Sequence, residues 1–101
     1  MINTVAKGTR KEKACADELK AQGYLTWKVI NVKYQSLDLF GLFDVCGLAK
    51  DGSHLIFIQS KSNRCDTATR DKIAKLKMPA NCRKEIWIWK DRKYFVKEYY
   101  D

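Results

Sequence analysis

The chain has 101 residues, of which 46% are apolar and 12% aromatic, enough for one hydrophobic core and too few for two. We therefore expect a single domain over residues 1–101. Twenty lysines and arginines against twelve acidic residues give a net charge of +8, which favours polyanionic partners, above all nucleic acid. There is no run of eighteen apolar residues and no apolar N-terminal segment, so we expect a soluble, cytoplasmic (intracellular) protein without a membrane partner.

The first predicted element is a helix over residues 3–22 that ends at Gly23, a residue suited to a left-handed C-cap. Its apolar stripe is expected at Val5, Gly8, Glu12, Cys15, Ala16 and Leu19. A glutamate therefore lies inside the stripe.

Residues 24–32 are rich in aromatic and β-branched types and predict a strand, followed by a connection over residues 33–41. Residues 42–61 predict a hairpin, because two apolar segments flank Asp51-Gly52, a pair typical of two-residue turns. This turn sets Asp44 opposite Gln59. Strand alternation then puts Asp44, Gln59 and Lys61 on one face of the sheet. The other face is expected to carry Phe43, Val45, Ile56 and Ile58.

After the hairpin we expect a polar loop and a short helix, N-capped by Asp66 or Thr67 and ending before Pro79. Strands are predicted at residues 85–89 and 94–100. The helix is long enough to set the strands on either side of it parallel. The expected order is thus α-β-β-β-α-β-β. The cysteines at positions 15, 46, 65 and 82 lack metal-ligand spacing, so we expect reduced thiols.

The polar residues at the ends of these elements fall into three motifs. Lys7-Gly8-Thr9-Arg10-Lys11-Glu12 lies in the first helix, Asp44 begins the second strand, and Gln59-Ser60-Lys61 ends the third. In this arrangement the chain resembles the PD-(D/E)XK nuclease superfamily, and within it the small Holliday-junction-resolvase-like nucleases in a glutamine (QxK) version. The resemblance implies an α/β fold with a restriction-endonuclease-like αβββαβ core, in which helices flank a central mixed sheet, here with an extra C-terminal strand.

The resemblance also implies a metal-dependent endonuclease that hydrolyses phosphodiester bonds in DNA. The expected cofactor is Mg²⁺, with Mn²⁺ as a substitute, because a hard cation with oxygen ligands polarises phosphate and activates water. The expected catalytic residues are Glu12, Asp44, Gln59 and Lys61. The expected metal ligands are Asp44, the Gln59 side-chain oxygen, the Ser60 backbone carbonyl, and Glu12 directly or through water. Gln59 is neutral where an acidic residue is commoner, so the site has one negative charge fewer and is expected to bind one metal ion rather than two.

Basic residues near these motifs are expected to neutralise phosphates of the nucleic acid. They are Lys7, Arg10, Lys11, Arg64, Arg70 and Lys72. The resemblance implies branched DNA as the substrate and a homodimer whose paired sites cut two strands symmetrically.

Other interpretations stay open at this point. The chain could be a nickase, a restriction-like enzyme or an RNA-cleaving nuclease of the same fold, and Gln59 keeps a non-catalytic nucleic-acid-binding module in play. Asp44 and Lys61 could form a structural ion pair, and Glu12 could pair with a neighbouring lysine. In an unbroken strand Asp38 would lie about 20 Å from Asp44, too far for one metal site, so it could be functional only through a bent connection. His54 is expected to be solvated, far from the motifs.

Overall fold

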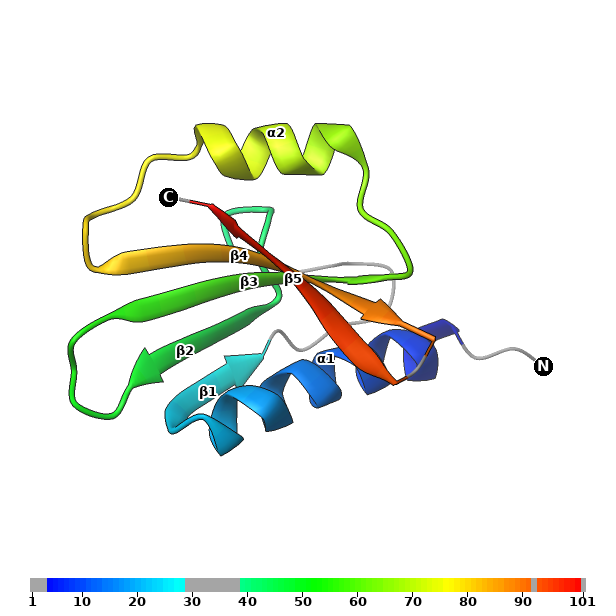
Figure 1. Cartoon of the computed structure of the whole chain (residues 1–101), viewed down its shortest axis with the longest axis horizontal. Helices are drawn as coiled ribbons and strands as arrows, with labels where there is room; N and C mark the ends of the chain where they lie inside the picture. The colour runs from blue at the N-terminus through cyan, green and yellow to red at the C-terminus, as the bar shows by residue number, and fades with distance from the viewer. Residues whose placement is uncertain (1–3, 29–38, 92, 101) are drawn as a thin grey trace.

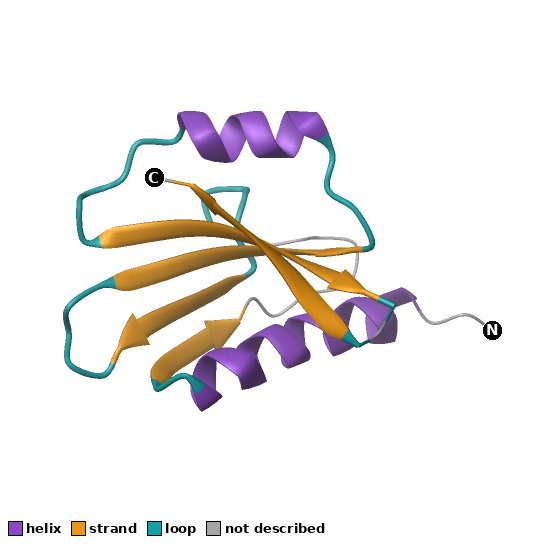
Figure 2. Ribbon diagram, viewed as in Figure 1, coloured by secondary structure: helices purple, strands orange, loops and turns teal. Residues whose placement is uncertain are grey.

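The computed structural model describes residues 4–28, 39–91 and 93–100, with side chains from residue 13 onward. The helices and strands follow the predicted order α-β-β-β-α-β-β, which is confirmed (Figures 1 and 2). They are α1 (Thr4–Ala21), β1 (Tyr24–Lys28), β2 (Val45–Ala49), β3 (Leu55–Ser62), α2 (Thr67–Lys75), β4 (Cys82–Lys90) and β5 (Tyr94–Tyr100).

The five strands form one sheet in the order β1-β2-β3-β4-β5. Neighbouring strands are antiparallel except β3 and β4, which α2 connects in parallel. Helices α1 and α2 lie on opposite sides of the sheet (Figure 1). The expected α/β class, with a mixed sheet between helices and an additional strand at the C-terminal end, is confirmed.

Each helix covers its own hydrophobic cluster. On the α1 side, Cys15 and Leu19 pack against Val45, Ile56, Ile58 and Trp87. On the α2 side, Ile73 packs with Phe43, Cys65, Ile86 and Ile88. Cys15, Ala16 and Leu19 are buried as the apolar stripe predicts, whereas the side chains of Val5 and Glu12 lie outside the described part of the chain.

The predicted C-terminal end of α1 and the predicted N-cap of α2 are confirmed. Gly23 follows α1 with a φ of +95°, and its N–H donates to the Lys20 carbonyl at 3.0 Å. Asp66 caps α2, its side chain accepting the Thr69 N–H at 3.1 Å. Neither α1 nor α2, the helices of the described residues, is long and apolar enough to cross a membrane.

The β2–β3 hairpin has the predicted register, because Val45 pairs with Ile58 and Leu48 with Leu55. The predicted two-residue turn is wrong. Residues 50–53 form a four-residue loop, in which the Gly52 N–H donates to the Ala49 carbonyl at 2.8 Å and Gly52 alone has a positive φ, +75°. Four-residue loops built around a tight turn also close hairpins, so the pairing of the strands is unchanged.

Gly47 lies in the middle of β2 because a side chain there would meet the core. A Cβ atom at this position would lie 2.9 Å from Cγ2 of Ile56 and 3.1 Å from Cδ1 of Tyr24. We expect Gly47→Ala to lower the free energy of unfolding by about 1–3 kcal/mol through overpacking. Urea denaturation measures this, with Cys46→Ala as the control on the opposite face. Wild-type stability of Gly47→Ala would show that α1 and β3 separate at little cost.

Candidate functional site

Asp44 lies immediately before β2, at the point where β2 and β3 separate, and is only 5% exposed. Its N–H donates to the Ile58 carbonyl at 3.0 Å. Its carboxylate accepts two hydrogen bonds from Ser60, from the N–H to Oδ1 at 3.0 Å and from the hydroxyl to Oδ2 at 2.7 Å. Ser60 is itself buried, at 1% exposure. The Asp44 side chain thus accepts the Ser60 N–H, which a backbone carbonyl would accept if the pairing between β2 and β3 continued.

The expectation that Asp44 shares a face with Gln59 and Lys61 is wrong. The Ser60 hydroxyl that binds Asp44 lies on the α1 side, since Ser60 alternates with Ile58 in β3. Burial and, to a lesser degree, the charge of Asp44 raise the pKa of the Cys15 thiol, which places the carboxylate near α1.

Phe43 departs from its predicted face in the same way, because it belongs to the α2-side cluster. The turn before it is the cause. Phe40 and Gly41 both have positive φ, of 54° and 70°, and Phe43 bridges back to Leu39 rather than pairing with β3. Without a ladder to β3, alternation does not extend across the start of β2.

Gln59 and Lys61 lie on the α2 side, because they alternate with Phe57, which packs against the α2-side cluster. Gln59 is 8% exposed, and its Oε1 atom is buried without a hydrogen-bond partner among the described residues. Lys61 is half-buried and lies towards Cys65 and Asp66. After the hydrogen bond from Thr69, its charge helps to lower the pKa of Asp66. The structure brings together Asp44 and Ser60, and Gln59 and Lys61 lie across the sheet from that contact.

The oxygen atoms at this strand end suit a hard divalent cation. The N–H and C=O of one strand residue point towards the same neighbouring strand, so the Ser60 carbonyl faces the end of β2, where Asp44 lies. The unpartnered Gln59 oxygen is a costly group to bury unless something binds it. Among the side chains that the structure describes, no three His, Cys, Asp or Glu residues cluster, and the Glu12 side chain is not among them. The Asp44 carboxylate and the Ser60 carbonyl are the kind of oxygen ligand that Mg²⁺ takes, whereas the Gln59 amide oxygen lies on the other face of the sheet.

The Ser60 hydroxyl is a site residue that sequence reasoning missed, since only the Ser60 carbonyl was expected to take part. The available signal was a serine inside the buried end of an apolar strand, where a hydroxyl needs a partner.

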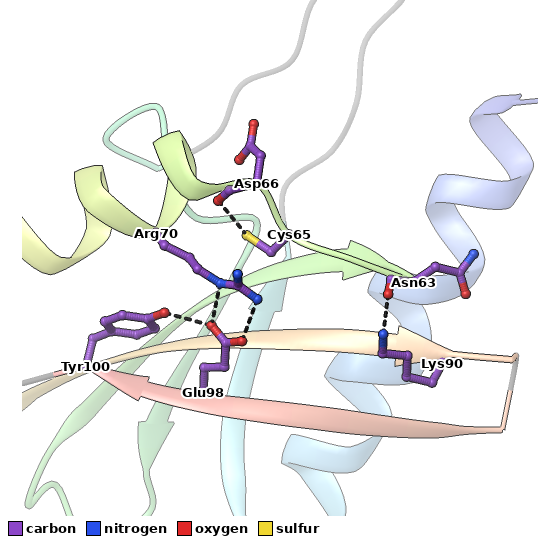
Figure 3. A network of polar contacts seen from close by, with 7 residues as sticks. All are labelled: Asn63, Cys65, Asp66, Arg70, Lys90, Glu98 and Tyr100. Atoms are coloured by element: carbon purple, nitrogen blue, oxygen red, sulfur yellow. Dashed lines mark hydrogen bonds and ion pairs between the residues drawn. The ribbon is translucent and has the colours of Figure 1, made fainter.

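The basic residues expected to bind phosphate differ in their surroundings. Arg64 and Lys72 are exposed. Arg70 instead forms a two-bond ion pair with Glu98, at 2.9 and 2.7 Å, and the Tyr100 hydroxyl donates to the same carboxylate at 2.7 Å (Figure 3). The guanidinium of Arg70 is therefore engaged within the protein. Lys7, Arg10 and Lys11 belong to α1, and their side chains lie outside the described part.

This ion pair predicts a pH effect on stability. Burial by itself raises the pKa of Glu98, but the hydrogen bonds from Arg70 and Tyr100 outweigh it and hold the pKa below its ordinary value of 4.5. The stabilisation is therefore present above pH 4.5 and is lost as the pH falls through the lowered pKa. Because the Arg70 side chain is 38% exposed, we expect less than about 1 kcal/mol.

Urea denaturation between pH 7 and pH 3 measures this contribution. Glu98→Gln is expected to be less stable than wild type at pH 7 and to lose less stability on acidification, with Asp71→Asn as the exposed control. Parallel pH profiles for wild type and Glu98→Gln would contradict the assignment.

His54 is not simply solvated, so that expectation is wrong. Its Nε2 lies 2.6 Å from the Tyr24 hydroxyl and its Nδ1 lies 2.9 Å from the Ser53 hydroxyl. These contacts tie the β2–β3 loop to the start of β1, at the end of the hairpin remote from Asp44.

Two buried charged residues in β4 were not anticipated. The Lys84 ammonium donates to the carbonyls of Ile73 and Leu76, at 2.8 and 2.6 Å, at the C-terminal end of α2. Glu85 accepts the Trp87 indole N–H at 2.8 Å, and burial raises the pKa of its carboxyl group. Both residues lie within the sheet, and their contacts are internal.

Comparison of the chain with protein-family models, with curated proteins and with solved structures finds no match.

Proposed function

We propose that the protein is a metal-dependent endonuclease that hydrolyses phosphodiester bonds in DNA. The observation that carries this proposal is the buried Asp44 carboxylate, bound by Ser60 where β2 and β3 separate. Buried carboxylates are costly unless they are paired or coordinate a metal, so their presence at a strand end favours a functional site. In this chain Gln59 and Lys61 follow on the adjacent strand.

The topology supports the proposal. Helix α1, the antiparallel strands β1 to β3, and the parallel β4 after α2 have the connections of the αβββαβ core implied by the resemblance to PD-(D/E)XK nucleases. Strand β5 would be the extra C-terminal strand. The net charge of +8 suits a polyanionic substrate.

In this proposal Asp44 and the Ser60 carbonyl, with Glu12 directly or through water, hold one Mg²⁺, and Gln59, on the other face of the sheet, is not a ligand. The bound ion would polarise the scissile phosphate and lower the pKa of a bound water. Ser60 holds the carboxylate of Asp44 in one orientation through both of its hydrogen bonds. Lys61 lies on the other face of the sheet, so in this proposal it would pair with a flanking phosphate of the nucleic acid rather than with the attacking water.

The preferred substrate in this proposal is branched DNA, cut by a homodimer whose two sites act symmetrically. Both parts rest on the resemblance to junction resolvases. Sedimentation velocity tests the dimer separately, and a strict monomer at all concentrations would remove the paired cutting.

The test is cleavage of labelled four-way junction, linear duplex and single-stranded DNA with Mg²⁺, Mn²⁺ or EDTA. Metal-dependent nicks placed symmetrically in the junction are the expected result. Salt-sensitive binding without cleavage in either metal would reject the enzyme and leave a nucleic-acid-binding module. That alternative has its own support, because Gln59 is neutral and both Asp44 oxygens already accept hydrogen bonds.

A further inference from the structure

Part of the sheet on the α2 side is apolar and open to solvent. Two rows of paired residues cross β1, β2 and β3 on this side, and both end on partly covered residues of β3. The rows are Leu25, Leu48 and Leu55, and Trp27, Cys46 and Phe57. Helix α2 packs over β4, where Ile73 meets Ile86 and Ile88, and Figure 1 shows β1 and β2 lying away from it. Leu25 is 58% exposed and Trp27 is 50% exposed.

Phe40 extends this aromatic surface towards the candidate site. Phe40 is 68% exposed, and the centroid of its ring lies 5.9 Å from that of Phe57. The loop that carries it is closed by hydrogen bonds between Leu39 and Phe43, at 2.7 and 3.0 Å, and leads directly into Asp44.

The conformation of Phe40 is unusual for such a residue. Its φ of 54° is a left-handed value that a bulky side chain rarely adopts. Backbone strain of this kind costs on the order of 1–3 kcal/mol and gathers at functional sites. A strained backbone that leaves an aromatic ring in solvent points to a ligand for that ring.

The charge of the surroundings selects the kind of ligand. Lys61 lies on the same side of β3 as Phe57, and the whole chain carries +8. A second copy of the chain would bring the same positive charge to this face. Unpaired nucleobases stack on aromatic rings while their phosphates pair with lysines, and each stacked base contributes about 1–3 kcal/mol.

We propose that Phe40 and Trp27 form a stacking platform for unpaired bases, so that the substrate class is nucleic acid with single-stranded segments, such as a branch point, rather than continuous duplex. This inference rests on the proposed function, because it places those bases beside the strand end that holds Asp44. It names two binding residues outside the motifs.

Binding in EDTA tests the platform without cleavage. Fluorescence anisotropy would compare a labelled thymidine oligonucleotide, the matching uridine oligonucleotide and a blunt duplex, using wild type, Phe40→Ala and Trp27→Ala. We expect each variant to bind the single strands at least about tenfold more weakly, with duplex binding unchanged. Phe40→Tyr should restore binding, because it keeps the ring. Tyr99→Ala is the matched control, since Tyr99 is 70% exposed but pairs with Glu85 on the α1 side.

Trp27 gives a second readout. Bound single strands should quench the tryptophan fluorescence of wild type and leave that of Trp27→Phe unchanged, because Trp87 is buried, at 1% exposure, and Trp89 packs on Phe95.

Two results would overturn the platform. The first is unchanged single-strand affinity in Phe40→Ala and Trp27→Ala, with circular dichroism showing that both are folded. The second is loss of self-association in these variants without loss of binding, which would make this face a contact between copies of the chain. If either result is found while wild type shows metal-dependent cleavage, the stacking platform is rejected and the endonuclease proposal stands. If Phe40→Ala weakens single-strand binding but wild type cleaves no substrate, the endonuclease proposal is rejected and the stacking platform stands.

Discussion

Asp44→Asn is expected to lower metal-dependent cleavage on the order of 10²–10⁴-fold while leaving the protein folded. The substitution removes the buried carboxylate that this site would offer to a cation. It keeps an acceptor oxygen for the Ser60 N–H, and the Ser60 hydroxyl can rotate to accept from the new amide. We therefore expect the free energy of unfolding to change by about 1 kcal/mol or less.

Single-turnover cleavage at saturating protein measures the rate, and urea denaturation of the same samples measures the stability. Asp17→Asn, an exposed position on α1, is the matched control for the loss of one negative charge. Wild-type cleavage by Asp44→Asn would show that Asp44 only closes the β2–β3 ladder. If wild type shows no cleavage and Asp44→Asn is much less stable than wild type, Asp44 likewise has only this structural role.

The order of the elements and the register of the central hairpin could be predicted because both depend on local patterns. Gly23 and Asp66 mark helix ends through the backbone conformation or the hydrogen bond that each residue type favours. The pairing of Val45 with Ile58 survives the wrong turn type, because a two-residue and a four-residue loop centred on the same residues close the same ladder.

The side of the sheet on which Asp44 lies could not be predicted. Side chains alternate regularly between the two faces only where the strand is paired in a β-ladder. Phe43 pairs with Leu39 instead of with β3, and the left-handed conformation of Phe40 that allows this is rare for its type. The sequence therefore identified Asp44 as a buried strand-end carboxylate but assigned it the wrong partners.

Contacts between elements that are far apart in the sequence could not be predicted either. Arg70 and Glu98 belong to α2 and β5, and no spacing in the sequence relates them. The expectation that Arg70 is free to bind phosphate came from its neighbours in the chain. In the folded protein, Glu98 of β5 pairs with this guanidinium instead.

Lys84→Met is expected to lower the free energy of unfolding by about 2–3 kcal/mol. Lys84 is 3% exposed, and its ammonium binds the carbonyls of Ile73 and Leu76 at the C-terminal end of α2, of which the Ile73 carbonyl also accepts the Leu76 N–H at 3.3 Å. A positive charge there also interacts favourably with the helix dipole. Methionine fills the same volume but removes the charged donor from both carbonyls, and only the Ile73 carbonyl keeps another donor, the Leu76 N–H.

Lys75→Met is the matched control, because Lys75 ends α2 but is exposed, and a change within about 0.5 kcal/mol is expected. Urea denaturation with equal slopes for the three proteins gives the difference directly. Next to Lys84 lies an open cavity of about 510 Å³, lined by Leu76, Pro79 and Arg83 among others. If Lys84→Met is as stable as Lys75→Met, water entering from this cavity replaces the ammonium, and Lys84 does not hold the end of α2 in place.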